Sequence, residues 1–253
     1  MFSKELYQKY IHTNILGYDL IYQPQTNSTN EDAWQYFMDG TPEGTLIVTD
    51  NQTSGKGRRD NKWDSATNKS LTFSLILHPQ IELEKLGLLP LLTGVSIVKG
   101  IKSATSIQTG LKWPNDIMLN KQKLGGILIE SRQTSNGLGV VVGVGLNINE
   151  QIQDFSHTLK NQATSLALFS GQTYSREQIL SAILNEFEAL YNNQMDSIIF
   201  QWTDHCIHQD KEVSFHSGQI KHQGIFQRIS SQGYAEIQIK GETQTFPSGV
   251  VIL

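Results

Sequence analysis

The chain has 253 residues, 38% hydrophobic and 17% charged, which is enough to bury a core in one large domain or in two. A net charge of −4 argues against a general nucleic-acid binder, and the single cysteine, Cys206, excludes an intramolecular disulfide and indicates a reducing compartment. The first residues lack the apolar run of a signal peptide, and we expect no apolar segment near the about 18 residues that span a membrane. The expected location is therefore the cytoplasm.

The first half of the chain predicts alternating helices and strands, although residues 1–25 give no clear pattern. Capping residues, apolar runs and glycine or proline breaks mark the boundaries. The expected elements are a helix that is capped by Ser28 and Thr29 and runs to about Met38, a buried strand over 45–49, a half-buried strand over 70–78, and a long apolar helix over 84–105 whose first turns Pro90 and the glycines interrupt.

The second half predicts successive hairpins, then a helix, then a region of short strands. The expected elements are strands over 110–119, 124–131 and 139–147 with turns at 120–122 and Asn136-Gly137, a helix over 176–195, and short strands within 211–253 that are spaced by Gly218, Gly233, Gly241 and Gly249. We therefore predict an α+β protein with a mixed β-sheet flanked by helices in residues 1–205, and a small β-barrel in residues 206–253.

One loop, Gly55–Trp63, combines two glycines, four cations and one aromatic residue (Gly-Lys-Gly-Arg-Arg-Asp-Asn-Lys-Trp). Glycines let the backbone approach a ligand closely, cations bind phosphate or carboxylate oxygens, and an indole offers a face for stacking. The loop therefore has the groups that hold a nucleotide against an acid. The alternative is a solvated basic loop, and the loop alone does not decide between the two.

Three further stretches supply polar groups at predicted strand ends or turns. Ser28-Thr29-Asn30 could receive a polar group at a helix N-terminus or could only cap that helix. Lys112-Trp113-Pro114-Asn115-Asp116 leads into Lys123–Glu130, where Trp113-Pro114 could only stiffen a strand end and Gly125-Gly126 could be a bulge. Gly143 and Gly145 lie inside a predicted strand, where glycine is unfavourable unless another group approaches closely. Neither a P-loop nor a dinucleotide fingerprint is present in the sequence.

These motifs together resemble those of the biotin–protein ligase family. They are Ser28-Thr29-Asn30, G-x-G-R-R-x-x-x-W, K-W-P-N-D, K-x-G-G-I-L-x-E and G-x-G-x-N, in an order and spacing that match over about residues 20–150. The resemblance implies a class II aminoacyl-tRNA synthetase-like biotin/lipoate ligase domain with a small C-terminal SH3-like domain. It implies ATP-dependent activation of biotin as biotinyl-5′-AMP, with Mg²⁺, and transfer to a lysine of a biotin carboxyl carrier domain.

The resemblance also implies roles for individual residues. Arg58, Lys123 and Asp116 would be catalytic, the first two by neutralising charge at the α-phosphate and Asp116 by steering the incoming amine or Mg²⁺. The residues implied to bind biotin are Ser28, Thr29, Asn30, Gln52, Gly55, Lys56, Gly57, Arg58, Lys123 and Gly126. Those implied to bind ATP are Lys56, Arg58, Arg59, Trp63, Asn115, Lys123 and Asn147. Lys56 departs from the family pattern, which usually has arginine there, and lysine lacks the bidentate fork.

Several alternatives stay open. A lipoate–protein ligase would share the fold, and a homologue without activity could only bind biotin. A repressor that also ligates biotin would carry a winged-helix domain before Ser28, for which we expect no room, so we predict a monofunctional enzyme without DNA binding. We expect no protein-held metal, because the His205, Cys206 and His208 spacing fits no zinc pattern. A homodimer is left open.

Overall fold

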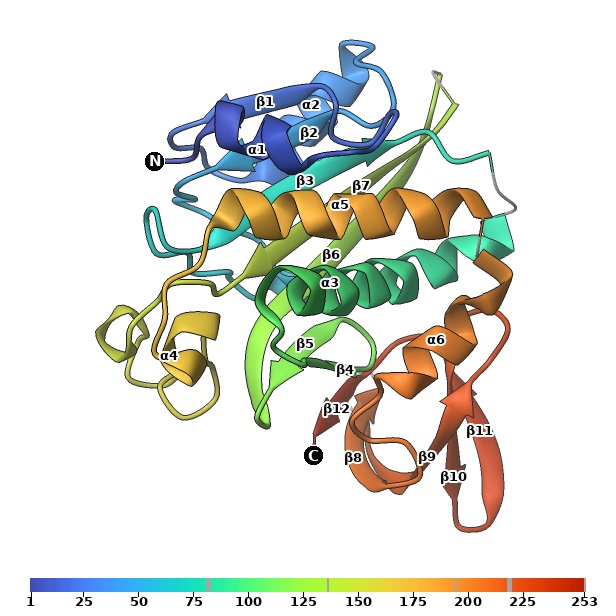
Figure 1. Ribbon diagram of the computed structural model, residues 1–253. Coiled ribbons are helices and arrows are strands. Elements are labelled where there is room, and N and C mark those ends of the chain that lie inside the picture. Colours follow the sequence, from blue (N-terminus) through green and yellow to red (C-terminus); the bar gives the residue numbers. More distant parts are fainter. Residues whose placement is uncertain (81–82, 136, 194, 218–219, 253) are drawn as a thin grey trace.

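Two β-sheets organise the chain in the computed structural model, which describes residues 1–80, 83–135, 137–193, 195–217 and 220–252 (Figure 1). Within these residues, the first sheet has seven strands in the order β1-β2-β3-β7-β6-β5-β4, and the second has five in the order β11-β10-β9-β8-β12. In the first sheet β1 and β2 are parallel and every other neighbouring pair is antiparallel, so the predicted mixed sheet is confirmed. Its strands are β1 (Leu20–Gln23), β2 (Leu46–Thr49), β3 (Leu71–Leu77), β4 (Gly110–Lys112), β5 (Asp116–Leu119), β6 (Gln122–Thr134) and β7 (Gly137–Leu146).

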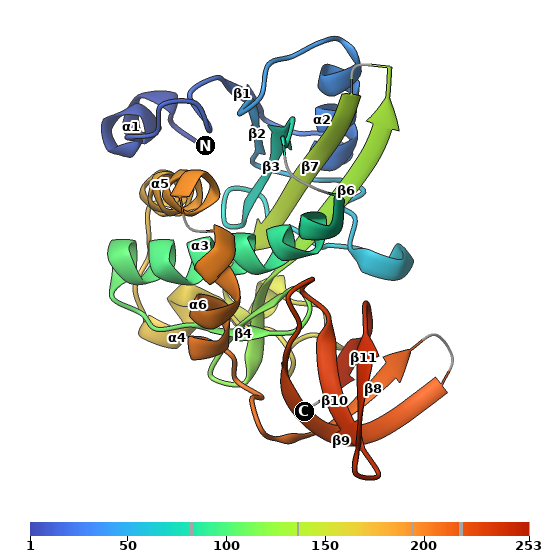
Figure 2. The same ribbon diagram turned by 90° about the vertical axis from the view of Figure 1, so that its right-hand side faces the viewer.

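Helices cover both faces of this first sheet. On one face α3 and α5 lie side by side, α1 packs against α5, and their apolar residues join the main core (Figures 1 and 2). On the other face α2 contributes Ala33, Trp34 and Phe37 to a smaller cluster with Ile47, Ile76 and Val141. The helices are α1 (Lys4–Tyr10), α2 (Thr29–Met38), α3 (Leu89–Thr105), α4 (Leu166–Ser170), α5 (Arg176–Asn193) and α6 (Ile198–Asp204), with 3₁₀ turns at Arg58–Asp60, Leu83–Leu88, Ile152–Asp154 and Met195–Ser197.

Strand β3 is buried along its whole length, so the prediction of a half-buried strand is wrong. Leu71, Phe73 and Leu75 face the main core as the alternation indicated. The opposite face, which includes Thr72 and Ser74, is covered by α2 and by the loop after β2 rather than by water. Alternation of apolar and polar residues shows which face is apolar, but it does not show what covers the polar face.

The segment 110–119 is a tight hairpin of β4 and β5, not the single strand that its composition predicted. A cis peptide bond between Trp113 and Pro114 lies at the turn between the two short strands. Lys112 and Asp116 therefore become direct cross-strand partners, although four positions separate them in the sequence. The first and last residues of the K-W-P-N-D motif therefore lie next to each other on the hairpin.

The apolar helix over 84–105 is confirmed from Leu89 to Thr105, and its first turns form a 3₁₀ helix, Leu83–Leu88. The expectation that no apolar stretch is long enough to span a membrane is wrong, because Glu84–Thr105 is long and apolar enough by composition. Buried core helices meet the same criteria, and 67% of this apolar window is buried inside the protein. The helix thus packs as the centre of the main core.

The second sheet is antiparallel throughout and consistent with the predicted small SH3-like domain. Its strands are β8 (Glu212–Ser217), β9 (Ile220–Ile229), β10 (Ala235–Ile239), β11 (Glu242–Phe246) and β12 (Val250–Ile252). Strand β11, whose residues are polar and largely exposed, lies between the predicted turn residues Gly241 and Gly249. The predicted turn residues Asn136 and Gly218 lie outside the described residues. The boundary between 205 and 206 stays a prediction.

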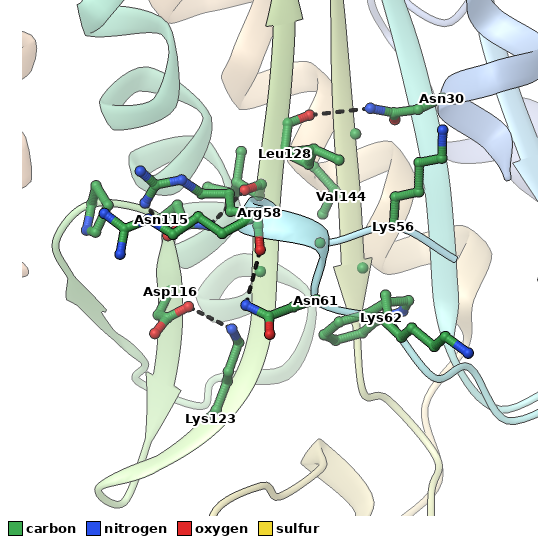
Figure 3. Close-up of a pocket in the computed structure, with 18 of the residues that line it drawn as sticks. Asn30, Lys56, Arg58, Asn61, Lys62, Asn115, Asp116, Lys123, Leu128 and Val144 are labelled. Carbon is green, nitrogen blue, oxygen red and sulfur yellow. Dashed lines mark hydrogen bonds and ion pairs between the residues drawn. The ribbon is translucent and has the colours of Figure 1, made fainter. Parts of the chain in front are cut away.

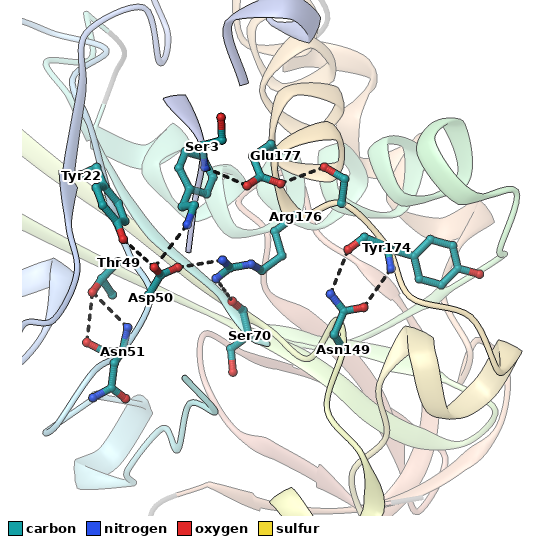
Figure 4. Close-up of polar contacts among 12 residues, drawn as sticks. Ser3, Tyr22, Thr49, Asp50, Asn51, Ser70, Asn149, Tyr174, Arg176 and Glu177 are labelled. Atoms are coloured by element: carbon teal, nitrogen blue, oxygen red, sulfur yellow. Dashed lines mark hydrogen bonds and ion pairs between the residues drawn. The ribbon is translucent and has the colours of Figure 1, made fainter. Parts of the chain in front are cut away.

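A buried polar network ties the N-terminal residues to the sheet and to α5 (Figure 4). Asp50, at the end of β2, forms an ion pair with Arg176 at 2.8 Å and accepts hydrogen bonds from the Tyr22 hydroxyl and the Phe2 amide. Arg176 also donates to the carbonyl of Ser70. Because Asp50 directly precedes the segment that leads into the glycine-rich loop, this network fixes the base of that loop.

Candidate active site

One cavity gathers most of the residues that the motifs singled out (Figure 3). It lies between the N-terminus of α2, the loop after β2, the β4–β5 hairpin and the floor made by β3, β7 and β6. The predicted site residues that line it are Ser28, Thr29, Asn30, Gln52, Lys56, Gly57, Arg58, Arg59, Trp63, Asn115, Asp116, Lys123 and Gly126. Gly55 and Asn147 lie beside it and line neighbouring cavities.

One end of the cavity is rich in uncharged hydrogen-bonding side chains. The Oε1 atom of Gln52 accepts from the Thr29 amide at 2.8 Å and from the Thr29 hydroxyl at 3.2 Å. The Ser74 hydroxyl donates to Oδ1 of Asn30 and lies 2.7 Å from the Thr29 hydroxyl oxygen, and Asn30 in turn donates to Glu130 at 2.8 Å. Ser28 begins α2 without a side-chain capping bond, so its role is not ordinary capping. These contacts hold the polar groups in fixed orientations.

Gly143 and Gly145 are explained by close approach. A side chain on Gly143 would meet Oδ1 of Asn30 at 2.1 Å, and one on Gly145 would meet the indole of Trp63 at 2.3 Å. These separations are far below van der Waals contact, so only glycine lets Asn30 and Trp63 lie on the sheet. The prediction that something approaches these strand glycines is confirmed, and it is the protein's own side chains that do so.

The opposite end of the cavity is cationic around one buried carboxylate. Asp116 forms an ion pair with Lys123 at 2.6 Å through one oxygen and with Lys112 at 2.9 Å through the other (Figure 3). Burial alone would raise the pKa of Asp116, but the charges of Lys123 and Lys112 and their hydrogen bonds outweigh it, so the pKa is lowered. Asp116 is therefore an ionised group that orients two lysines.

The glycine-rich loop closes over this end. Hydrogen bonds from the Trp63 amide to the Gly55 carbonyl and from the Gly57 amide to the Asn61 carbonyl join its two limbs. At its tip Arg58 donates to Asn115 at 3.1 Å. Burial, and next the charge of Arg59, lower the pKa of Arg58, while Asp116 opposes the shift. The loop thus presents a partly desolvated guanidinium to the cavity.

Lys56 pairs with Glu31 of α2 at 2.6 Å, and both side chains are about half exposed, 50% and 49%. An ion pair this exposed contributes at most about 1 kcal/mol. In this structure the ammonium group is thus held by α2 rather than by the groups around Asp116. Whether Lys56 contacts a ligand stays a prediction.

The sequence did not single out several residues that line the cavity. Lys112 was named only as the start of its motif, and Thr72 was not named at all. Gly249, Val250 and Val251 reach the cavity from the second sheet. That sheet is held to the first by the indole of Trp113, which donates to the carbonyl of Gly233 at 3.3 Å. No local pattern could have indicated this distant contribution.

A neighbouring cavity shares Lys62, Trp63 and Lys123 with the first and also includes Asn147 and Glu150. Asn147 is buried and donates to the carbonyl of Thr164 at 3.0 Å. Glu150 is 2% exposed and accepts a short 2.5 Å hydrogen bond from Ser70. Burial is the main cause that raises the pKa of Glu150, from 4.5 to about 7.

We expect Glu150 to make stability fall as the pH rises. Because its pKa is raised in the folded state, the folded protein holds a proton that the unfolded chain releases between pH 4.5 and about 7. The free energy of unfolding then decreases across this window, by up to about 3 kcal/mol. Urea unfolding at a series of pH values should show a smaller decrease for Glu150→Gln than for the unmodified protein. Parallel pH profiles for the two proteins would contradict the assignment.

The junction between the two sheets contains His205, Cys206 and His208. Backbone hydrogen bonds link residues 205 and 207 to Leu111 of β4. The His208 ring is fully buried, packs edge-on against Phe226, and its pKa is lowered to about 3, mainly by burial. Its nearest sulfur is Cys206, 3.4 Å from Nδ1. Among the described residues, no group of three or more acidic, cysteine or histidine side chains could hold a metal ion.

Comparison with known proteins agrees with the motifs. The model of the biotin/lipoate A/B protein ligase family matches residues 22–147. The bifunctional ligase/repressor BirA of Bacillus spizizenii is 41% identical over 186 residues, which cover 73% of this chain and 57% of BirA. The biotin–[acetyl-CoA-carboxylase] ligase of Mycobacterium tuberculosis is 31% identical over 170 residues, 65% of this chain and 61% of that protein.

The fold comparison reaches further along the chain. The structure of the Aquifex aeolicus biotin protein ligase in complex with biotin and ATP matches with a TM-score of 0.81 at 26% identity. The match covers 93% of this chain and 99% of that one, so it includes the second sheet. The chain spans 57% to 61% of the length of the two curated relatives named above. From the motifs, the matched family model and these relatives, the chain belongs to the biotin/lipoate A/B protein ligase family.

Proposed function

We propose that this protein activates biotin with Mg-ATP and transfers it to a lysine of a biotin carboxyl carrier domain. The observation that supports this most is the polarity of the cavity. Neutral hydrogen-bonding groups at Thr29, Asn30 and Gln52 occupy one end, and a group of cations around Asp116 occupies the other. Biotin has the complementary distribution of charge, with a neutral ureido group at one end and a carboxylate at the other.

In the first step, a carboxylate oxygen of biotin attacks the α-phosphorus of ATP, and pyrophosphate leaves. Two anions meet in this step, so the site must supply cations directed at the phosphoryl oxygens. Lys123 and Arg58 are proposed for this task, and Asp116 is proposed to orient Lys123 and Lys112. Since lysines hold both oxygens of Asp116, we favour this role over Mg²⁺ binding by Asp116.

In the second step, a lysine amine of the acceptor attacks the carbonyl of the mixed anhydride. An amide bond forms, AMP leaves, and the amine loses a proton. Trp63 and Asn147 are proposed to hold the nucleotide in the cavity beside Glu150, while Ser28, Gly55, Gly57 and Gly126 complete the biotin pocket and Lys56 and Arg59 close it from the loop. The acceptor domain and the cytoplasmic location belong to this proposal, as does any self-association.

Biotin-dependent exchange of labelled pyrophosphate into ATP tests the proposal. We expect exchange with biotin and little or none with lipoate at the same concentration. Exchange with lipoate alone would favour the lipoate branch of the family. If the protein binds biotin but shows no exchange, it is a binding protein and the proposed ligase activity is refuted.

A further inference from the structure

A row of four residues crosses the floor of the cavity, one on each of four neighbouring strands. Thr72 of β3 pairs with Gly145 of β7. Gly145 pairs with Gly126 of β6, which pairs with Asp116 of β5. Directly opposed residues of antiparallel strands point to the same face, with Cβ positions about 5 Å apart. We call these four residues the floor row. The side chains of Thr72 and Asp116 therefore face the same space as the two glycines between them.

Two side chains lie above the glycines of the floor row. The indole of Trp63 rests on Gly145, with Nε1 2.6 Å from the position that a Cβ atom would take. The ammonium of Lys123 lies 3.5 Å from the corresponding position of Gly126. Lys123 is held at one end of the row by Asp116. Thr72 is at the other end, beside Trp63.

Two polar atoms at the Thr72 end have no hydrogen-bond partner among the residues that the structure describes. They are Oγ1 of Thr72 and Nε1 of Trp63, and both are inaccessible to solvent. Thr72 itself is only 4% exposed. Ser74, two residues further on the same face, has its hydroxyl bonded to Thr29 and Asn30. A buried polar group without a partner is unfavourable, so each one calls for an explanation such as a catalytic role or a bound water or ion.

We propose that Thr72 contacts the substrate. Its hydroxyl and the indole N–H of Trp63 donate hydrogen bonds to one anionic oxygen at the Thr72 end of the floor row, next to the position over which Lys123 lies. An indole N–H can only donate, so its partner must be an acceptor. The adjacent ammonium of Lys123 favours an acceptor with negative charge. This inference rests on the proposed function, in which the oxygen belongs either to the biotin carboxylate or to the α-phosphate.

The test compares Thr72→Val, which removes only the hydroxyl, with Thr72→Ser, which restores it. Thr93→Val is the matched control, because Thr93 is equally buried in α3, bonds its own helix and lies outside the cavity. For each protein we would measure the dissociation constants of biotin and of biotinol, which has an alcohol in place of the carboxylate, and the rate of pyrophosphate exchange.

Hydrogen bonds to charged groups are strong. We therefore expect Thr72→Val to lose affinity for biotin, or exchange rate, by about tenfold or more. Thr72→Ser should regain most of that loss. A loss of affinity for biotin but not for biotinol assigns the contact to the carboxylate. Unchanged affinity for biotin with slower exchange assigns it to the phosphoryl oxygen. Wild-type values for Thr72→Val, or equal losses in Thr72→Val, Thr72→Ser and Thr93→Val, would overturn the proposal. Failure of the proposed function is seen separately, as absent exchange in the unmodified protein.

Discussion

Replacing Lys123 by alanine should slow biotin-dependent pyrophosphate exchange by about a hundredfold to a thousandfold. The ammonium of Lys123 lies above Gly126, 2.6 Å from Asp116, at the cationic end of the cavity. In the proposed reaction it stabilises charge that develops on the phosphoryl oxygens, so its removal should lower the rate constant more than it weakens biotin binding. Asp116 would still be paired with Lys112 in the variant, which should therefore stay folded.

Two further variants make this result specific. Lys123→Arg keeps the positive charge and should recover part of the lost rate, though with altered geometry. Lys102→Ala removes an exposed lysine in the last turn of α3 and should exchange at the wild-type rate. Near-normal exchange in a folded Lys123→Ala protein would contradict the catalytic role that we propose for Lys123.

Arg176→Met should lower the free energy of unfolding by about 3–5 kcal/mol, the range for breaking a buried ion pair from one side. Arg176 and Asp50 are 5% and 4% exposed, and methionine fills much of the volume of the arginine side chain without its charge. Asp50 would keep its bonds to Tyr22 and Phe2 but would lose the cation that offsets its burial. Urea unfolding at neutral pH measures the loss.

The pH dependence of this loss separates the ion pair from simple packing. Burial alone would raise the pKa of Asp50, but its hydrogen bonds and the charge of Arg176 outweigh that effect and lower it. Stability from Asp50 is thus present above its unfolded pKa and disappears as the pH falls through its folded pKa. The difference between Arg176→Met and the wild type should therefore shrink in acid. Arg228→Met breaks a pair in which the arginine is 69% exposed and Glu236 16%, so it should cost less than Arg176→Met. Equal losses in the two variants would show that burial of the pair is not the cause.

The strongest sequence signals were those in which chemistry and spacing are local. The capping residues and apolar spacing located α2 and α5, and a buried apolar run located β2. The G-x-G-R-R loop and the K-W-P-N-D motif indicated an anion site because cations, glycines and an indole occur within a few positions of each other. Most of the predicted residues do line one cavity, although their individual roles remain proposals.

The errors arose where distant parts of the chain decide the environment. The polar face of β3 looked solvent-exposed, but α2 and the loop after β2 cover it. The segment 110–119 looked like one strand, because local composition does not reveal that the backbone turns at Trp113-Pro114 and pairs with itself.

By itself, the sequence determined the residue types for a cationic, glycine-lined site, the helices and strands with strong periodicity, and the family that these motifs resemble. Only the tertiary structure decided which of these residues face each other. The register of β3, β7, β6 and β5 places Thr72 and Asp116 at opposite ends of one row, and the second sheet brings Val250 and Val251 to the same cavity. Register depends on pairing between segments far apart in the chain, so no local pattern of residues can fix it.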